Sequence, residues 1–255
     1  STFRKNGREP GMTDEAEGQR NDILSGLHAL IRSRWPEGDR DRLIAFVDLY
    51  LQRVATEDLL EKSVADLYGS LMSHWNLGVE RRPGMPAVRV YNPAMQQDGW
   101  ESTHSVVQIV TDDIPFLVDS TAIALNQRGL NIHLTVHPLL TVHRSEAGTL
   151  ESVADVSDGP AADPATASSE AWLHIELDRQ AEPSQLTAIA DAVSSALEDC
   201  RLAVGDWSEM HARLQQIIAE LQEVSVVPTE DREEIRAFLQ WLLDDHFTFL
   251  GYRCY

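Results

Sequence analysis

The stretch that decides the fold reads TDDIPFLVDS and runs from Thr111 to Ser120. The residues before it, 105–110 (SVVQIV), are rich in β-branched side chains, which favours a buried strand. After it, apolar residues recur at helical spacing as far as Gly129, where a helix end is expected. The next segment, 130–137 (LNIHLTVH), alternates apolar and polar residues and predicts a second strand. The stretch therefore forms the turn and helix start of a strand, helix, strand unit.

The turn carries residues that typically open a helix. Asp112 or Asp113 can accept hydrogen bonds from the unpaired N–H groups at the helix start, and a negative charge suits the helix dipole there. Pro115 fits the first turn because its missing N–H would have no partner in that position. Backbone donors at such a start can also hold a small anion or a carboxylate. The pattern thus indicates either a well-capped helix or a ligand site.

The order of the predicted elements indicates an α+β fold. Three amphipathic helices between residues 21 and 77 predict a small helical segment that covers another element. Residues 86–204 then follow the order strand, helix, strand, strand, helix, which is typical of an ACT or ferredoxin-like antiparallel sheet with helices on one face. The usual closing strand is missing after the second helix, and residues 87–92 could fill that edge. The further strands are predicted at 139–144 and 171–178.

The remaining segments are predicted from composition. Residues 1–20 are polar and are expected to form a disordered tail or to be ordered only by a neighbour. Residues 146–169 predict a long acidic loop inside the α+β domain. Residues 205–245 predict a helical linker, and 246–255 the first strand of a following domain. The chain is therefore expected to be a truncated piece of a longer protein.

The net charge of -20 limits the partners. Such a surface repels phosphate, which argues against nucleic acid and against an anionic membrane. No apolar run approaches the roughly 20 residues that span a bilayer, and no signal peptide is evident. Two cysteines, Cys200 and Cys254, do not form a disulfide framework, so a reducing cytoplasm is the expected setting.

The sequence contains few candidates for catalytic or metal-binding residues. His133, His137 and His143 could share one face and hold zinc, but no Cys or carboxylate lies at ligand spacing and Pro138 interrupts the strand between them. Asp residues at a helix start usually cap the helix, so we assign these to capping rather than to acid–base catalysis. The sequence has neither a glycine-rich phosphate loop nor a nucleophile elbow. We therefore predict no catalytic, cofactor-binding or metal-ligating residue in this chain.

Several segments carry a family resemblance. The run from Val106 to His137 resembles the first βαβ unit of ACT-type regulatory domains. More narrowly, DDIPFLVDS (112–120) together with RGLNIH (128–133) and VHP (136–138) resembles the N-terminal, non-catalytic region of the large bacterial NAD-specific glutamate dehydrogenases. Two further segments match that family, EDL (57–59) through SHW (73–75) and FTFLGY (247–252). The resemblance thus extends from about residue 25 to the end.

The resemblance implies a function that the residues alone do not show. Members of that family oxidise L-glutamate to 2-oxoglutarate and ammonia with NAD, and their catalytic and dinucleotide-binding residues lie far C-terminal of this region. Domains of the ACT type bind amino acids, often between paired copies, and pass the binding on to a catalytic domain. The implied partners are the catalytic region of the same chain, a second copy of the chain and an amino-acid effector. The candidate effector-binding residues are Asp112, Asp113, Ile114, Pro115, Phe116, Asn131 and His133.

One position departs from the ACT pattern. Many ACT domains have a glycine after the proline of the first turn, which lets the ligand approach the backbone, whereas this chain has Phe116. The unit could therefore serve assembly alone. Three hypotheses stay open at this point: a regulatory and oligomerisation region of a large glutamate dehydrogenase, a free-standing amino-acid-sensing module, and a small metal enzyme that uses the three histidines.

Overall fold

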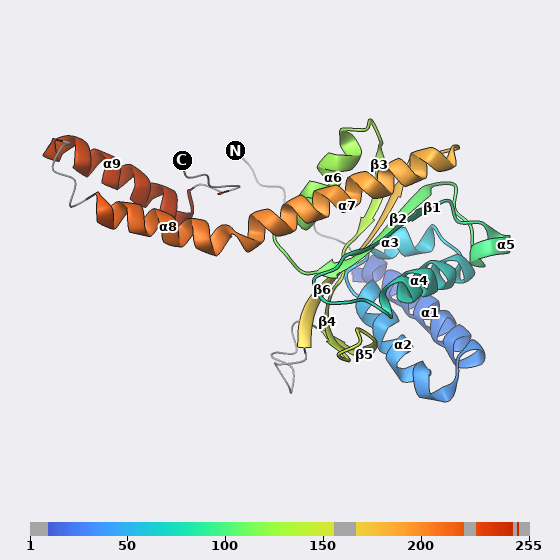
Figure 1. Cartoon of the computed structure of the whole chain (residues 1–255). Coiled ribbons are helices and arrows are strands. Elements are labelled where there is room, and N and C mark those ends of the chain that lie inside the picture. Colours follow the sequence, from blue (N-terminus) through green and yellow to red (C-terminus); the bar gives the residue numbers. More distant parts are fainter. Residues whose placement is uncertain (1–9, 156–166, 222–227, 247–248, 250–255) are drawn as a thin grey trace. The chain divides into compact units, whose positions relative to one another are not determined.

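The computed structural model of the chain describes residues 10–155, 167–221, 228–246 and 249 (Figure 1). They fall into two units. The first contains the described residues up to Asp113 and the segment Val118–Ser194. The second contains Ile114–Leu117 and the described residues from Ser195 onward.

The described part of the first unit contains a six-stranded antiparallel sheet. The strand order is β1-β2-β6-β4-β5, and β3 pairs with β6 beyond the end of β4. The long strand β6 can hold both because Pro138 separates β3 from β4, so each pairs with a different half of β6. The strands are β1 (Ala87–Tyr91), β2 (Ser105–Asp112), β3 (Ile132–Val136), β4 (Leu139–Arg144), β5 (Leu150–Asp155) and β6 (Ala167–Leu177).

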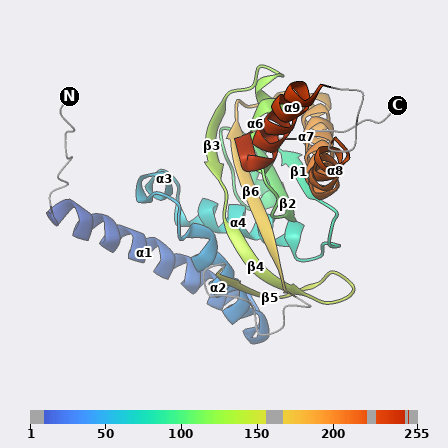
Figure 2. The ribbon, with the colours of Figure 1, turned by 90° about the vertical axis from the view of Figure 1, so that its left-hand side faces the viewer.

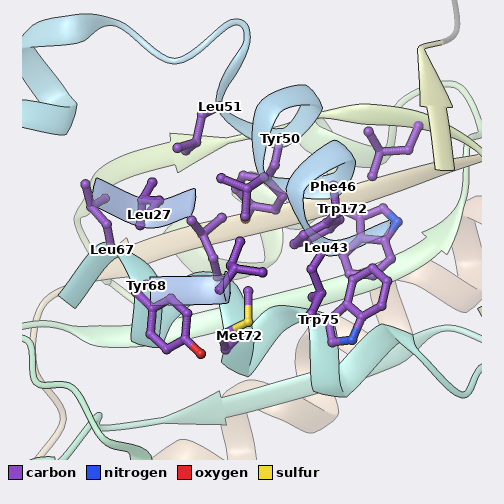
Figure 3. Packing of buried hydrophobic residues seen from close by; sticks show 14 of the residues in the cluster. Leu27, Leu43, Phe46, Tyr50, Leu51, Leu67, Tyr68, Met72, Trp75 and Trp172 are labelled. Carbon is purple, nitrogen blue, oxygen red and sulfur yellow. The ribbon is translucent and has the colours of Figure 1, made fainter. Parts of the chain in front are cut away.

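A layer of N-terminal helices packs on one face of this sheet. Its core combines side chains of α1, α2 and α4 with residues of the strands, and Figure 3 shows Trp172 of β6 among them. The ring of Phe46 lies 5.0 Å from the rings of both Trp75 and Trp172. Gly78 is required at this contact, because a Cβ there would lie 2.2 Å from the Trp172 ring. The helices are α1 (Pro10–Arg34), α2 (Glu37–Leu51), α3 (Thr56–Leu60) and α4 (Val64–Gly78).

The opposite face is covered by α6 (Leu117–Asn126) and by the first half of α7 (Pro183–Gly205), as Figures 1 and 2 show. Because both faces are covered, every residue from Ser105 to Thr111 in β2 is buried. Gly129 has a φ of 73°, the left-handed conformation that the sequence predicts after this helix. A short helix, α5 (Met95–Asp98), lies between β1 and β2.

The second unit is helical in its described residues. The end of α7 is followed by α8 (Trp207–Glu220), α9 (Thr229–Trp241) and a π-helical turn, Leu242–His246. Met210, Leu214 and Leu243 are buried within the unit. The thiol of Cys200 donates to the carbonyl oxygen of Pro115 at 3.2 Å. The short segment before α6 thereby joins the end of α7.

The predicted fold class is confirmed, since the chain forms an ACT-like α+β fold around an antiparallel sheet. The edge role proposed for residues 87–92 is also correct, because β1 pairs antiparallel with β2 from Ala87 to Tyr91. The helical segment covers the second face of the sheet, so helices lie on both faces rather than on one.

Other boundaries differ from the predictions. Residues 10–20 are helical rather than part of a tail, because α1 begins at Pro10 and Arg20 donates to the carbonyl oxygens of Leu51 and Val54 near the end of α2. Residues 1–9 lie outside the described residues. The last of the three helices expected between residues 21 and 77 is in fact two, α3 and α4. The second begins where the Ser63 hydroxyl accepts a hydrogen bond from the Asp66 N–H at 3.0 Å.

The predicted acidic loop 146–169 is partly sheet. Leu150 opens β5, is fully buried and packs in the helical core, while Ala167 to Ser169 already belong to β6. Residues 156–166 lie outside the described residues. The strand predicted at 246–255 is not found at His246, which ends the π-helical turn; residues 247–248 and 250–255 are also outside the described part.

Candidate functional site

Asp112, the first candidate effector residue, lies at the end of β2. Its Oδ1 accepts a hydrogen bond from Arg81 Nη2 at 2.6 Å, and its Oδ2 accepts one from the Gly84 N–H at 2.9 Å. This is a different role from the predicted helix cap, since the carboxylate ties the end of β2 to the loop after α4. Asp113 is anchored to β6, because its N–H donates to the Ser169 carbonyl at 3.0 Å and its Oδ2 accepts from the Ser169 hydroxyl at 3.1 Å.

Arg81 belongs to a buried ionic cluster that the sequence did not reveal. Glu170 is fully buried on β6, and its Oε1 accepts from Arg81 Nη2 at 2.5 Å. Arg144 adds a two-pronged contact, with Nε to Oε1 at 2.7 Å and Nη2 to Oε2 at 2.8 Å. Arg144 also donates to the carbonyl oxygens of Gly78 and Gly148. Two arginines and two carboxylates thus neutralise one another in an ion-pair network that stabilises the fold.

Phe116 lies in the second unit with a φ of 65°, in the left-handed region that favours glycine. Its side chain is 53% exposed. The turn therefore has a backbone conformation that glycine favours, although the residue is large. Ile114 and Pro115 belong to the same short segment of the second unit.

Asn131 and His133 lie at the start of β3, where both bind Asp178. Asn131 donates from its N–H at 3.1 Å and from Nδ2 at 2.6 Å to Asp178 Oδ2, and His133 Nε2 lies 2.7 Å from Oδ1. The hydrogen bond from His133 is the main cause that lowers the pKa of Asp178 below its usual value. Sequence reasoning singled out Asn131 and His133 but missed their common partner.

The candidate effector residues of the sheet do not form a single site. Asp112 pairs with Glu170 on β6, and Ile132 pairs with Leu177. Seven residues of β6 separate these positions, which corresponds to about 23 Å of strand. Whether an effector binds at the Asp112 end and whether one binds at the His133 end are therefore two separate predictions.

A cluster of histidines and one carboxylate lies next to His133. The rings of His133 and His104 are 4.5 Å apart, and His104 Nδ1 lies 3.4 Å from Glu176 Oε2. Glu176 Oε1 accepts from Lys62 Nζ and lies 3.2 Å from His174 Nε2. Burial raises the pKa of Glu176, but the hydrogen bonds from His174 and Lys62 outweigh it and lower that pKa to about 2. Lys62, His104 and Glu176 come from three distant segments, so no local sequence signal identifies them.

This cluster borders a pocket of about 330 Å³ between β3, the loop at 101–104 and the segment from Asp58 to Asp66. The pocket lies entirely in the first unit. The ionised Glu176 at its wall is balanced by Lys62, and most of the other charged residues around it are acidic: Asp58, Glu61, Asp66 and Glu101. The arrangement suits recognition of a polar ligand better than acid–base chemistry.

The SHW motif at residues 73–75 has a structural role. Burial lowers the pKa of His74 to about 3, so its imidazole is neutral. Its Nδ1 lies 2.8 Å from the Tyr50 hydroxyl and its Nε2 lies 3.1 Å from the Ile109 carbonyl oxygen. Ser73 contacts the Tyr91 hydroxyl at 2.8 Å. These bonds fix α4 to α2 and to the sheet.

The zinc hypothesis finds no ligand set in the structure. His133 is bound to Asp178, and His137 is half-buried, with a pKa lowered by burial. Within residues 10–155, 167–221, 228–246 and 249, no three His, Cys, Asp or Glu side chains are grouped as metal ligands would be. In the same residues, no helix is long and apolar enough to cross a membrane.

The sheet order, with α6 after β2 and α7 after β6, defines an ACT-like domain of the α+β class. The family model described as the glutamate dehydrogenase ACT1 domain matches residues 46–193. The chain therefore belongs to the family of glutamate dehydrogenase ACT1 domains, as the sequence resemblance predicts.

Three curated relatives are similar, and each is named an NAD-specific glutamate dehydrogenase. The protein of Halomonas elongata is 36% identical over 241 residues, which cover 92% of this chain and 14% of that protein. The protein of Pseudomonas aeruginosa is 36% identical over 209 residues, 81% of this chain and 13% of that protein. The protein of Mycobacterium tuberculosis is 26% identical over 187 residues, 72% of this chain and 11% of that protein. The chain thus spans between about a ninth and a seventh of the length of these relatives.

Proposed function

We propose that this chain is a non-catalytic regulatory and oligomerisation region of a large NAD-dependent glutamate dehydrogenase. The parent enzyme would oxidise L-glutamate to 2-oxoglutarate and ammonia in the cytoplasm, with NAD bound elsewhere in the polypeptide. The observation that carries this proposal is the 36% identity over 92% of the chain to an enzyme of which it spans 14%. The proposed partners are the catalytic region, a second copy of the chain and an amino-acid effector.

The state of the ionisable groups supports a non-catalytic role. Glu170 and Asp112 are held by Arg81, and Glu176 is held by Lys62 and His174. A general base needs a pKa near the working pH, whereas the pKa values of Glu176 and His74 lie at about 2 and about 3. These groups stabilise the fold and are poorly suited to proton transfer near neutral pH.

Two measurements test the proposal. The chain alone, given L-glutamate and NAD, should produce no NADH above background, while the parent enzyme turns over. Removal of this region from the parent should change its oligomeric state in analytical ultracentrifugation or its rate response to amino acids. NADH formation by the chain alone, or an unchanged assembly together with an unchanged response, would reject the proposal.

The second candidate is a free-standing amino-acid-sensing module. The backbone of Phe116 favours it, because the turn has the left-handed conformation that glycine favours and the residue is 53% exposed. A thermal-shift screen with the twenty amino acids would test it, since a ligand that binds only the folded form raises the melting temperature. A shift that is enhanced in Phe116→Gly would place binding at the turn. The absence of any shift would leave assembly as the role of this unit.

A further inference from the structure

The strand β3 lies at an edge of the sheet. Among the residues that the structure describes, β3 pairs with β6 alone, so its other side has no strand partner. Figure 2 shows α3 beyond this open side, on the flank away from β6. An exposed strand edge presents unpaired N–H and C=O groups that can bind a further strand.

A groove runs between β3 and the segment that contains α3. It consists of three adjoining hollows in the first unit, with volumes of about 260, 40 and 330 Å³. Asp58 borders all three, Val136 borders the first and the middle one, and Leu134 borders the middle and the last one. The hollows therefore follow β3 from His137 to His133 in the order large, small, large.

The charge of the groove identifies its ligand as cationic. Six carboxylates line the three hollows, against Arg53 and Lys62 as the basic side chains. Lys62 is already bound to Glu176, so the excess negative charge is concentrated on the exposed rim. The acidic residues are Asp58, Glu61, Asp66, Glu101, Asp155 and Glu176.

A buried polar atom indicates that a hydrogen-bonding group is missing at the centre of the groove. His174 borders the small hollow and is 4% exposed, and its Nδ1 has no hydrogen-bond partner among the described residues. Its Nε2 lies 3.2 Å from Glu176 Oε1, so Nδ1 is the ring nitrogen left without a partner. An unsatisfied buried polar atom is costly, and a hydroxyl group can either donate to a ring nitrogen or accept from it, so a small hydroxyl-bearing side chain fits this hollow.

We propose that this groove binds an extended, basic segment of a partner polypeptide, which adds to the sheet as a strand beside β3. Side chains of a strand point to one face at every second residue, so three inward positions match the three hollows. The chemistry is lysine or arginine at the two large hollows and serine at the small one. A second copy of this chain is a poor occupant, because its own groove and its net charge of -20 repel this surface.

The first test measures the affinity of a capped peptide that contains lysine, valine, serine, valine and lysine in that order. Isothermal titration with the whole chain should show saturable binding with one peptide per chain. Glutamate in place of both lysines should abolish binding, and alanine in place of serine should weaken it several-fold. Equal binding of the glutamate peptide would overturn the charge assignment, and equal binding of the alanine peptide would overturn the assigned contact with His174.

Charge variants of the protein locate the site. Glu61 and Glu101 are exposed on the groove. The double variant Glu61→Lys with Glu101→Lys should therefore weaken binding of the lysine peptide by roughly tenfold or more. The matched control changes Glu151 and Glu182, which are exposed outside the groove, to lysine and gives the same net charge. If the control weakens binding equally, the peptide recognises overall charge and the groove is not its site.

Backbone methylation tests the strand addition itself. In an added strand, alternate N–H groups point toward β3, so N-methylation of the central serine and N-methylation of the neighbouring valines should differ by at least roughly tenfold in affinity. Equal effects of the two would reject pairing with β3. The proposal does not depend on the parent enzyme being a glutamate dehydrogenase, because every arm of the test uses the chain alone.

Discussion

The two ends of the sheet hold the same kinds of charged side chain in different settings. At the Asp112 end, Glu170 and the arginines form a cluster in which Glu170 is fully buried and Arg81 is 4% exposed. At the His133 end, the pair between His133 and Asp178 is about two-fifths exposed and lies beside an open pocket. The comparison indicates that the first end holds the fold together and the second is available to a ligand.

The largest expected effect is at the buried end. Glu170→Gln removes the charge that neutralises Arg81 and Arg144. The buried guanidinium of Arg81 keeps its pair with Asp112, whereas that of Arg144 loses its pair with the Glu170 carboxylate. We expect a loss of about 3 to 5 kcal/mol in the free energy of unfolding, measured by urea denaturation with tryptophan fluorescence. Glu198→Gln, which breaks an exposed pair with Arg201, should leave the urea midpoint unchanged. A loss as small as that of the control would show that water reaches the cluster.

The second prediction concerns Glu176, which lies between the two settings because it is buried but borders the pocket. Its pKa is about 2 in the folded chain and 4.5 in the reference state, so the unfolded chain takes up the proton at a higher pH. The stabilisation is therefore complete above about pH 4.5 and is lost as the pH falls toward 2. Its size is on the order of 2 to 3 kcal/mol.

The measurement compares the wild type with Glu176→Gln. The difference in their free energies of unfolding should shrink between pH 6 and pH 3, because only the wild type loses this charge. The low pKa of His74 destabilises both proteins in acid and cancels in the difference. For Glu182→Gln, at an exposed position, the difference should not vary with pH. A constant difference for Glu176→Gln would contradict the predicted pKa.

The sequence predicts local elements well because their signals are local. The β-branched run of β2, the alternation in β3 and the left-handed Gly129 each lie within a few residues of the structure they specify. In contrast, β5 has only Leu150 and Val153 as bulky apolar residues in an acidic stretch, and its pairing with β4 supplies what the pattern lacks. Arg20 of α1 donates to the carbonyl oxygens of Leu51 and Val54, and such a tertiary contact has no signal in the local sequence.

The candidate site was harder to predict for the same reason. Asp112 was assigned to a helix start on local grounds, but Arg81, which lies 31 positions away in the sequence, determines its role. The groove combines β3 with a segment about 75 residues earlier in the chain, and no local pattern in either segment indicates that the two lie side by side. Only the family resemblance connected these segments before the fold was known.

A smaller effect is expected at the turn after β2. Phe116 has a φ of 65°, which costs a non-glycine residue about 1 to 2 kcal/mol, and its exposed ring contributes little packing. We expect Phe116→Gly to raise the free energy of unfolding by about 1 kcal/mol, with part of the gain lost to the flexibility of glycine in the unfolded chain. Phe116→Ala is the control, because it removes the ring but keeps the strained conformation, and it should bring no gain. A gain that is equal in both variants would assign the effect to the ring.

The smallest effect on stability is expected at the His133 end of the sheet, where it tests directly whether the two ends differ in role. Asp178→Asn keeps the size of the side chain and its ability to accept from Asn131 while removing the charge next to His133. Exposed ion pairs contribute little, so the urea midpoint should not change measurably. A large loss of stability in this variant would mean that both ends of the sheet are structural, and it would remove the distinction on which a ligand-binding end depends.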